Sequence, residues 1–133
     1  MTEGVPERCA RFMELADEAL GDARAAHQRH SLRAALNRAY YAAFYAASAL
    51  LTARGLHSAK HRGVLSLFDR EFVLTGEMSR HHGRALRRLF EKRSDADYDI
   101  YGSFEPDAVA DALQKASELI EDSRTLLERL LAD

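Results

Sequence analysis

The sequence predicts an all-α protein, an antiparallel up-and-down bundle of about five helices. Apolar residues recur at helical spacing in several long stretches, and no stretch shows the period-two alternation of a strand. The interval between Arg38 and Arg54 carries no charge and is rich in alanine and aromatic residues. A surface helix has one apolar stripe, whereas this one has two, so we expect a central helix with neighbours on at least two sides.

Length and composition indicate a single folded domain over residues 1–133. Hydrophobic residues make up 47% of the chain and charged residues 30%, as in soluble globular proteins. No run of eighteen apolar residues occurs, and the N-terminus lacks a basic segment followed by an apolar one. We therefore expect neither a membrane span nor a secretion signal, and a cytoplasmic location.

The first two expected helices are joined by a short turn. Pro6 suits the first turn of a helix that runs to about Arg29. Ser31 is the candidate N-cap of the central helix, and Gly55 is its candidate C-terminal stop. Helices joined by a short turn lie antiparallel.

Three further helices follow. The third is expected after a cap near Ser58, and the fourth covers about residues 78–93. Residues 94–107 are acidic and aromatic and are expected to form a loop. Pro106 marks the start of the last helix, whose inner apolar stripe extends to Leu130.

Two polar residues, Asn37 and Arg38, stand among the apolar residues of the central helix. A buried amide or guanidinium without a partner costs several kcal/mol, so their partners must come from elsewhere. Either Arg38 reaches solvent and Asn37 caps a nearby loop, or the two anchor a polar site. The aromatic residues that follow, including Tyr41, are interpreted as core or dimer seam in preference to a platform for stacked bases.

Arginines gather on the expected fourth helix. Four of them share one face: Arg80, Arg84, Arg87 and Arg88. Like charges at this spacing repel unless a negative group lies nearby. Arg84, Arg87 and Arg88 are therefore candidate phosphate contacts. The adjacent His81 and His82 either join this face or are simply solvated.

We expect no metal site and no cofactor. His57 and His61 have metal-ligand spacing only if both are helical, and a cap at Ser58 would leave His57 outside the helix. No acidic or cysteine cluster lies beside them. The single cysteine, Cys9, does not hold a metal by itself and has no partner for an internal disulfide.

The chain resembles the HEPN domain, the higher eukaryotes and prokaryotes nucleotide-binding family. The resemblance lies in NRAYYAAFYAASALL at 37–51, KHRGVLSLFDREFV at 60–73 and LFEKRSDADYDIY at 89–101, followed by an amphipathic helix. It covers roughly residues 10–131 and is greatest to the short stand-alone prokaryotic members. The resemblance implies a helical bundle that forms a homodimer, with a polar site near the dimer interface.

Many members of that family are metal-independent ribonucleases with an Arg followed, after four to six residues, by a His. The Arg steadies the developing charge on a phosphate, and the His moves a proton. In this chain the Arg is Arg93, no His follows it, and Tyr98 stands after four intervening residues. A tyrosine has an ordinary pKa of about 10 and is a poor base at neutral pH. The resemblance implies catalytic candidates Arg93, Asp97 and Tyr98, faced by RNA- or nucleotide-contacting Asn37, Arg38 and Tyr41.

Some members pair with a minimal nucleotidyltransferase that silences them by adding nucleotides to a tyrosine near the motif. Tyr98 and Tyr101 would be the modified residues here. The resemblance thus implies a component of a toxin–antitoxin or stress-response system that binds or cleaves RNA or binds a nucleotide. The absence of a His after Arg93 favours an alternative, a non-catalytic dimeric interaction module. A small-molecule nucleotide sensor is a third interpretation.

A purely structural interpretation of RSDADY also stands. Arg93 would bond loop carbonyls or Asp97, Asp95 would cap the turn, and Tyr98 would pack its ring against the central helix. A buried pair between Arg38 and Asp97 would suit either interpretation, because charge-assisted bonds serve binding and geometry alike.

Overall fold

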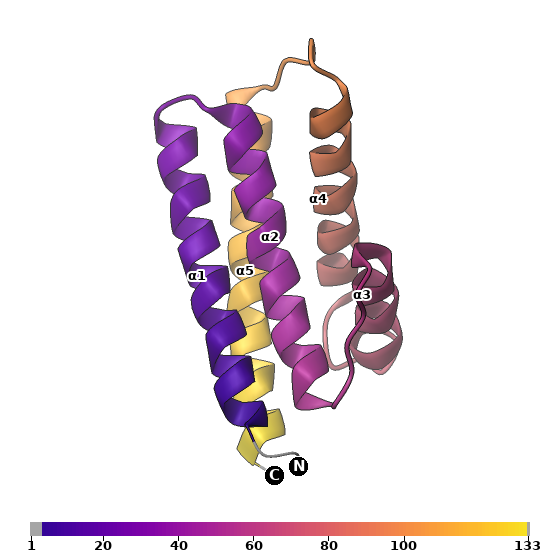
Figure 1. Ribbon diagram of the computed structural model, residues 1–133. Coiled ribbons are helices and arrows are strands. Elements are labelled where there is room, and N and C mark those ends of the chain that lie inside the picture. Colours follow the sequence, from indigo (N-terminus) through magenta and orange to yellow (C-terminus); the bar gives the residue numbers. More distant parts are fainter. Residues whose placement is uncertain (1–3, 133) are drawn as a thin grey trace.

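The computed structural model describes residues 4–132 as a bundle of helices (Figure 1). The elements are α1 (Val5–Gln28), α2 (Leu32–Ala53), α3 (His61–Phe68), the π-helix η1 (Asp69–Val73), α4 (Arg80–Tyr98) and α5 (Pro106–Ala132). No strand occurs in these residues, which confirms the predicted all-α class. None of the described helices is both long and apolar enough to cross a bilayer.

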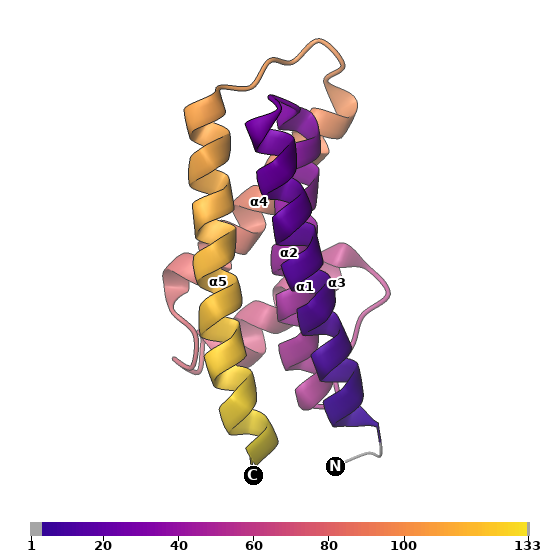
Figure 2. The same ribbon diagram turned by 90° about the vertical axis from the view of Figure 1, so that its left-hand side faces the viewer.

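Helix α2 is central, as the two apolar stripes predict. It contacts α1, α3, α4 and α5. Figures 1 and 2 show α1, α2 and α5 side by side, with α4 beside α2 and the short α3 against the lower halves of α2 and α4. The turn from α1 to α2 and the loop from α4 to α5 lie at one end of the bundle, opposite the chain termini (Figure 1).

Alanine allows the helices around α2 to approach closely. Seven alanines of α2 are fully buried: Ala35, Ala39, Ala42, Ala43, Ala46, Ala47 and Ala49. The Cys9 thiol of α1 donates to the Ala49 carbonyl at 3.4 Å, so the two helices meet at the level of the backbone. Small side chains on both surfaces are what permit such a short separation.

The predicted ends of α2 are correct, with one difference. Gly55 follows the helix with φ +73, the left-handed conformation that glycine adopts without strain. Ser31 occupies the N-cap position, but its side chain makes no capping hydrogen bond. The Ser31 amide instead donates to the Ala26 carbonyl at 2.8 Å, which closes the turn from α1.

Two predicted boundaries are wrong. Helix α3 begins at His61 with Lys60 in the N-cap position, two residues later than the cap expected near Ser58, because the Ser58 hydroxyl accepts from the Lys60 amide at 3.2 Å and forms a turn before the helix. Residues 94–98 are the last part of α4 and not a loop. Ala96, only 2% exposed, continues the buried stripe of the helix, and this packing outweighs the local polarity of the segment.

An ion pair fixes the end of α2 to the segment before α4. The Arg54 guanidinium contacts both carboxylate oxygens of Glu77, at 2.7 and 2.6 Å, and donates to the Glu71 carbonyl. The Thr75 hydroxyl donates to the same Glu77 carboxylate at 2.8 Å. The hydrogen bond from Arg54 lowers the pKa of Glu77 below its ordinary value.

We expect Glu77→Gln to destabilise the protein by about 1 kcal/mol at neutral pH, since the pair is only partly buried. A carboxylate with a lowered folded pKa stabilises above its unfolded pKa, and that contribution is lost as the pH falls through the folded value. The gap between variant and wild type should therefore close below about pH 4.5. Thermal unfolding followed by circular dichroism at several pH values measures it. Glu14→Gln, in an exposed pair, is the control, and a gap independent of pH would contradict the assignment.

Candidate functional site

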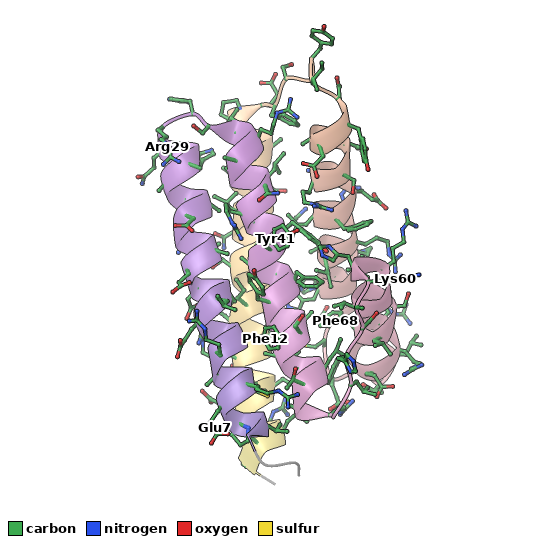
Figure 3. All side chains as sticks on the ribbon, viewed as in Figure 1. Glu7, Phe12, Arg29, Tyr41, Lys60 and Phe68 are labelled. Carbon is green, nitrogen blue, oxygen red and sulfur yellow. The ribbon has the colours of Figure 1, made fainter. Side chains whose placement is uncertain are left out.

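An aromatic cluster joins α2, α3 and α4 at the middle of the bundle. The Tyr40 ring is fully buried and has neighbouring rings at centroid distances of 5.2 to 5.8 Å: Tyr41, Phe44, His61 and Phe90. Tyr41 and Phe44 are partly exposed, and Figure 3 shows Tyr41 about midway along α2. The cluster therefore extends from the core to the surface. Polar side chains can pack against its partly exposed rings.

Arg93 of α4 lies on this cluster. Its Cζ is 5.1 Å from the Tyr40 ring centroid, 5.7 Å from that of Tyr41 and 5.9 Å from that of Phe90. The side chain is 18% exposed, and its Nε is buried without a hydrogen-bond partner in the described residues. A guanidinium over aromatic faces is a favourable arrangement, and its N–H groups, which lie in the guanidinium plane, remain able to donate at the terminal nitrogens.

Asp97 is the carboxylate that Arg93 contacts. The distance from Nη1 to Oδ2 is 3.4 Å, one helical turn along α4, and Asp97 is 45% exposed. This confirms the expected proximity of Arg93 and Asp97. Such an exposed, long pair contributes little and is easily exchanged for another anion.

Arg38 of α2 is a second guanidinium at the same place. Its Cζ is 5.2 Å from the Tyr41 centroid, and its Nε is also buried without a partner in the described chain. The expected pair between Arg38 and Asp97 is not formed, because Asp97 contacts Arg93 instead. Asn37, Arg38 and Asp97 nevertheless line one open hollow of about 570 Å³.

His61, the first residue of α3, belongs to the cluster too. Its Nδ1 lies 2.9 Å from the Tyr40 hydroxyl, and its ring centroid is 4.5 Å from that of Phe44. Burial, and then the charge of Arg93, lower the pKa of His61, while burial raises the pKa of Tyr40 and keeps its hydroxyl protonated. The sequence interpretation considered His61 only as a zinc ligand with His57. His61 and Arg93 are far apart in the sequence, so the sequence does not indicate that both contact Tyr40.

Tyr98 and Tyr101 are at the surface. Tyr98 ends α4 and is 88% exposed, while Ile100 is 74% and Tyr101 91% exposed. The structural interpretation in which Tyr98 packs against the central helix is therefore wrong. Arg33 of α2 donates to the carbonyls of Asp99 and Gly102, so α2 holds the loop that carries these exposed side chains.

The three candidate arginines of α4 do not lie together at the cluster. Arg84, Arg87 and Arg88 are all exposed. Arg87 pairs with Asp69 of η1 at 2.6 Å and borders the same hollow as Phe90. Arg88 lines a separate hollow next to α5. Of the three, only Arg87 adjoins the aromatic cluster.

The other histidines have different surroundings. His57 lies outside α3, as expected, and is exposed. His82 is 1% exposed and its Nε2 is 2.6 Å from Asp122 of α5, so it joins two helices and is not part of a solvated face. Residues 4–132 contain no group of three His, Cys, Asp or Glu side chains that could hold a metal ion.

Comparison with known proteins decides the family. The family model of the HEPN domain matches residues 10–126. The chain belongs to the HEPN family. A "UPF0332 protein" of Thermotoga maritima is 43% identical over 115 residues, which cover 86% of this chain and 87% of that protein. The range of the family model includes the three segments that carry the resemblance, at 37–51, 60–73 and 89–101.

Two relatives in Methanocaldococcus jannaschii have names that refer to a role. "Putative toxin MJ0605" is 34% identical over 98 residues, 74% of this HEPN chain and 73% of that protein. "Putative toxin MJ0142" is 37% identical over 65 residues, 49% of this chain and 44% of that protein.

Proposed function

We propose that this HEPN protein is the toxin-like component of a toxin–antitoxin or stress-response system and that it binds RNA. The observation that carries the proposal is the pair of guanidiniums, Arg38 and Arg93, seated on the aromatic cluster with buried Nε atoms that lack partners. The names of two relatives support the toxin-like role.

The chemistry of this pair suits a nucleic-acid backbone. A guanidinium whose Nε is buried without a partner is poorly compensated inside the protein, so a phosphate that accepts from its terminal nitrogens gains more than it would from a solvated arginine. Phosphate oxygens accept two parallel bonds from one guanidinium. Partly exposed Tyr41 and Phe44 lie beside the two guanidiniums, where an unpaired base can contact their exposed parts, and aromatic side chains commonly contact the bases of single-stranded RNA. The binding surface we propose consists of Asn37, Arg38, Tyr41 and Arg93, with Arg87 at its edge.

Asp97 and Tyr98 have supporting roles in this proposal. Asp97 holds Arg93 in place until a phosphate replaces it, since their separation is 3.4 Å and the carboxylate is 45% exposed. Tyr98, at the surface end of α4, and Tyr101 are the proposed acceptors of a nucleotide from a nucleotidyltransferase partner. Their exposure is what an enzyme acting on a folded substrate requires.

The test of RNA binding is a titration of labelled mixed-sequence single-stranded RNA at two salt concentrations. Arg93→Ala should weaken binding about 10- to 100-fold, the loss of a charged hydrogen bond, and should lower the salt slope by about 0.7. Arg70→Ala, which removes an equal charge from an exposed surface pair, is the matched control. Equal loss in both variants, or no salt-dependent binding by the wild type, contradicts the proposal.

The proposed addition of nucleotides to Tyr98 and Tyr101 is tested by mass spectrometry. When the protein is produced together with a nucleotidyltransferase from its own genomic neighbourhood, intact-mass analysis should find nucleotide adducts. Peptide mapping should place them on Tyr98 or Tyr101, and the double variant Tyr98→Phe with Tyr101→Phe should lack them completely. Tyr45→Phe, on the partly buried face of α2, should keep the adducts. Adducts that persist in the double variant exclude this assignment.

A non-catalytic interaction module is the second candidate. The exposed Tyr98, Ile100 and Tyr101 favour it, because large apolar side chains at a loop tip are typical of binding surfaces. The partly exposed aromatic face of α1 and α2, with Phe12 and Tyr45 at a centroid distance of 6.4 Å, would form the seam of a homodimer. Under this alternative Arg93→Ala changes stability and leaves no RNA phenotype.

A further inference from the structure

We propose that the RNA strand bound at Arg93 continues to a second phosphate subsite, formed by Arg62 of α3 and Arg87 of α4. The inference rests on the proposed function, since the first phosphate lies at Arg93. It assigns to this surface an extended single strand of several nucleotides, in preference to a mononucleotide or a free phosphate. It also gives a binding role to Arg62, which no pattern in the sequence singles out.

Arginine and aromatic side chains alternate from α2 through α4 to α3. The Arg38 Cζ lies 5.2 Å from the Tyr41 centroid, and the Arg93 Cζ lies 5.7 Å from the same centroid. The Arg93 Cζ is also 5.9 Å from the Phe90 centroid, and the Arg62 Cζ is 5.6 Å from it. Each of the two rings is therefore shared by guanidiniums of two helices. A strand of several phosphates can contact all three arginines, whereas a single phosphate cannot.

Arg62 and Arg93 are close enough to bind phosphates of one strand. Both Cζ atoms are measured from the Phe90 centroid, so their separation is at most the sum of 5.6 and 5.9 Å. Successive phosphates of a stacked strand advance about 3.4 Å along its axis, and they are farther apart in an extended strand. The upper limit therefore corresponds to phosphates that are neighbours, or nearly neighbours, in one RNA.

Arg62 and Arg87 border a hollow of about 250 Å³ between α3 and α4. The lining also includes the Ser66 hydroxyl, the Phe90 ring and the Glu91 carboxylate. Within residues 4–132 the Arg62 guanidinium has no ion pair, and the Ser66 hydroxyl has no hydrogen bond. Two guanidiniums and a hydroxyl at one hollow provide several donors for phosphate oxygens, and hydrogen bonds from charged donors are the stronger kind.

Asp69 of η1 holds Arg87 at this hollow. The Arg87 Nη2 donates to the Asp69 Oδ2 at 2.6 Å, and the Arg87 side chain is still 53% exposed. A guanidinium has five N–H donors, so one such bond leaves others for a ligand. Asp69 therefore fixes the position of Arg87 and leaves it able to bind a phosphate together with Arg62.

Glu91 favours a ribonucleotide over a simple anion in the hollow. Its carboxylate is exposed and forms no ion pair within the described chain. A carboxylate repels an inorganic phosphate, but it can accept a hydrogen bond from the ribose 2′-hydroxyl beside a bound phosphodiester. RNA carries the phosphate and this hydroxyl in each repeating unit. The lining of the hollow therefore fits one unit of an RNA strand.

The two subsites reinforce each other. The chain has a formal net charge of −2 at pH 7, so its overall charge does not attract RNA, and affinity depends on local contacts. Once one phosphate is bound at Arg93, the next reaches Arg62 at an effective concentration in roughly the millimolar range. Affinity should therefore increase with the number of phosphates, and Arg62 should contribute only when the RNA has a second phosphate.

The experiment compares a labelled single-stranded octanucleotide with a dinucleoside phosphate, which has one phosphate, at two salt concentrations. The wild type should bind the octanucleotide at least about 10-fold more tightly. Arg62→Ala should weaken octanucleotide binding about 10-fold and lower its salt slope by about 0.7. Affinity for the dinucleoside phosphate, measured by chemical-shift titration, should stay within about twofold of the wild type, since that probe occupies the Arg93 subsite alone.

Arg8→Ala is the matched control. It removes an exposed arginine that forms no ion pair within residues 4–132. Figure 3 shows Glu7, its neighbour in α1, and Lys60, just before α3, on opposite sides of the bundle. This variant should keep both the salt slope and the preference for the longer RNA.

A second variant keeps the test decisive if circular dichroism shows that Arg62→Ala is not folded. Arg62→Lys retains the charge and loses the planar fork of donors. It should keep the wild-type salt slope and lose part of the affinity for the octanucleotide. Wild-type affinity in Arg62→Lys would mean that Arg62 donates no paired bonds to a phosphate, and it would overturn the subsite.

The role of Glu91 is tested with DNA of the same sequence. The wild type should prefer RNA about 10-fold, the value of a hydrogen bond to a charged group. Glu91→Ala should reduce this preference, and the ratio of the two affinities cancels the effect of removing a charge. An unchanged preference would overturn the contact between Glu91 and the 2′-hydroxyl.

The outcomes separate this inference from the proposed function. Equal losses in Arg62→Ala and Arg8→Ala overturn the second subsite, as does an equal effect of Arg62→Ala on the octanucleotide and the dinucleoside phosphate. Binding that depends on Arg93 and not on Arg62 leaves the proposed function intact. A wild type without salt-dependent RNA binding overturns the proposed function itself.

Discussion

Tyr40→Ala should lower the free energy of unfolding by about 3–5 kcal/mol, the cost of emptying an aromatic site in a packed core. The Tyr40 ring is fully buried and touches rings from α2, α3 and α4. Because these neighbours come from three different helices, the space cannot close unless the helices move together. Denaturant unfolding followed by circular dichroism measures the change.

Two variants calibrate this result. Tyr45→Ala removes the same atoms from a partly exposed position on the same helix and should cost clearly less. Tyr40→Phe removes only the hydroxyl that bonds His61 and should cost about 1 kcal/mol. If Tyr40→Ala costs no more than Tyr45→Ala, then Tyr40 is not the support of the cluster.

The helices were predictable because their signals are local. Pro6 at the start of α1, Gly55 after α2 and Pro106 at the start of α5 act through their own backbone conformations. The length and double stripe of α2 also predicted its central position. Burial inside a bundle requires apolar residues on more than one side, and that requirement is visible in the sequence.

The end of α4 was not predictable in this way. Residues 94–98 have the composition of a loop, yet Ala96 packs into the core and Asp97 contacts Arg93 one turn earlier. Both contacts form only because α4 continues through residues 94–98. Tertiary packing overrides local propensity at such a terminus.

The candidate site was half predictable. The sequence singled out Arg38 by its polarity in an apolar helix, and the resemblance to HEPN domains singled out Arg93 and Asp97. His61 was missed because its relation to Arg93 exists only through Tyr40, a residue of a third element. A contact between elements far apart in sequence leaves no periodic signal in either of them.

The structure also explains why a polar site can sit on the most apolar helix. Aromatic rings accept a guanidinium on their faces, so Arg38 and Arg93 need no carboxylate to approach the core. Full neutralisation by acids would stabilise the arginines but would occupy the donors that we propose for a phosphate. The exposed Asp97, 3.4 Å from Arg93, is a weak partner, so Arg93 remains available to the phosphate that we propose.

The double variant Arg38→Ala with Arg93→Ala should weaken RNA binding by about 100-fold or more, since two charged hydrogen-bond donors are lost together. The salt slope should fall by about 1.4, or 0.7 for each phosphate contact to a single strand. Both guanidiniums stack on the Tyr41 ring, at 5.2 and 5.7 Å, so the two losses should not be additive. Titrations of the wild type, both single variants and the double variant close a thermodynamic cycle.

The matched control removes two charges elsewhere. Arg11→Ala with Arg70→Ala deletes two exposed arginines that are paired with glutamates, and its net charge equals that of the test variant. If RNA binding depended only on net charge, both double variants would lose affinity alike. A loss confined to the Arg38 and Arg93 pair, with a coupling energy different from zero, would mean that the two arginines hold one strand through their shared ring.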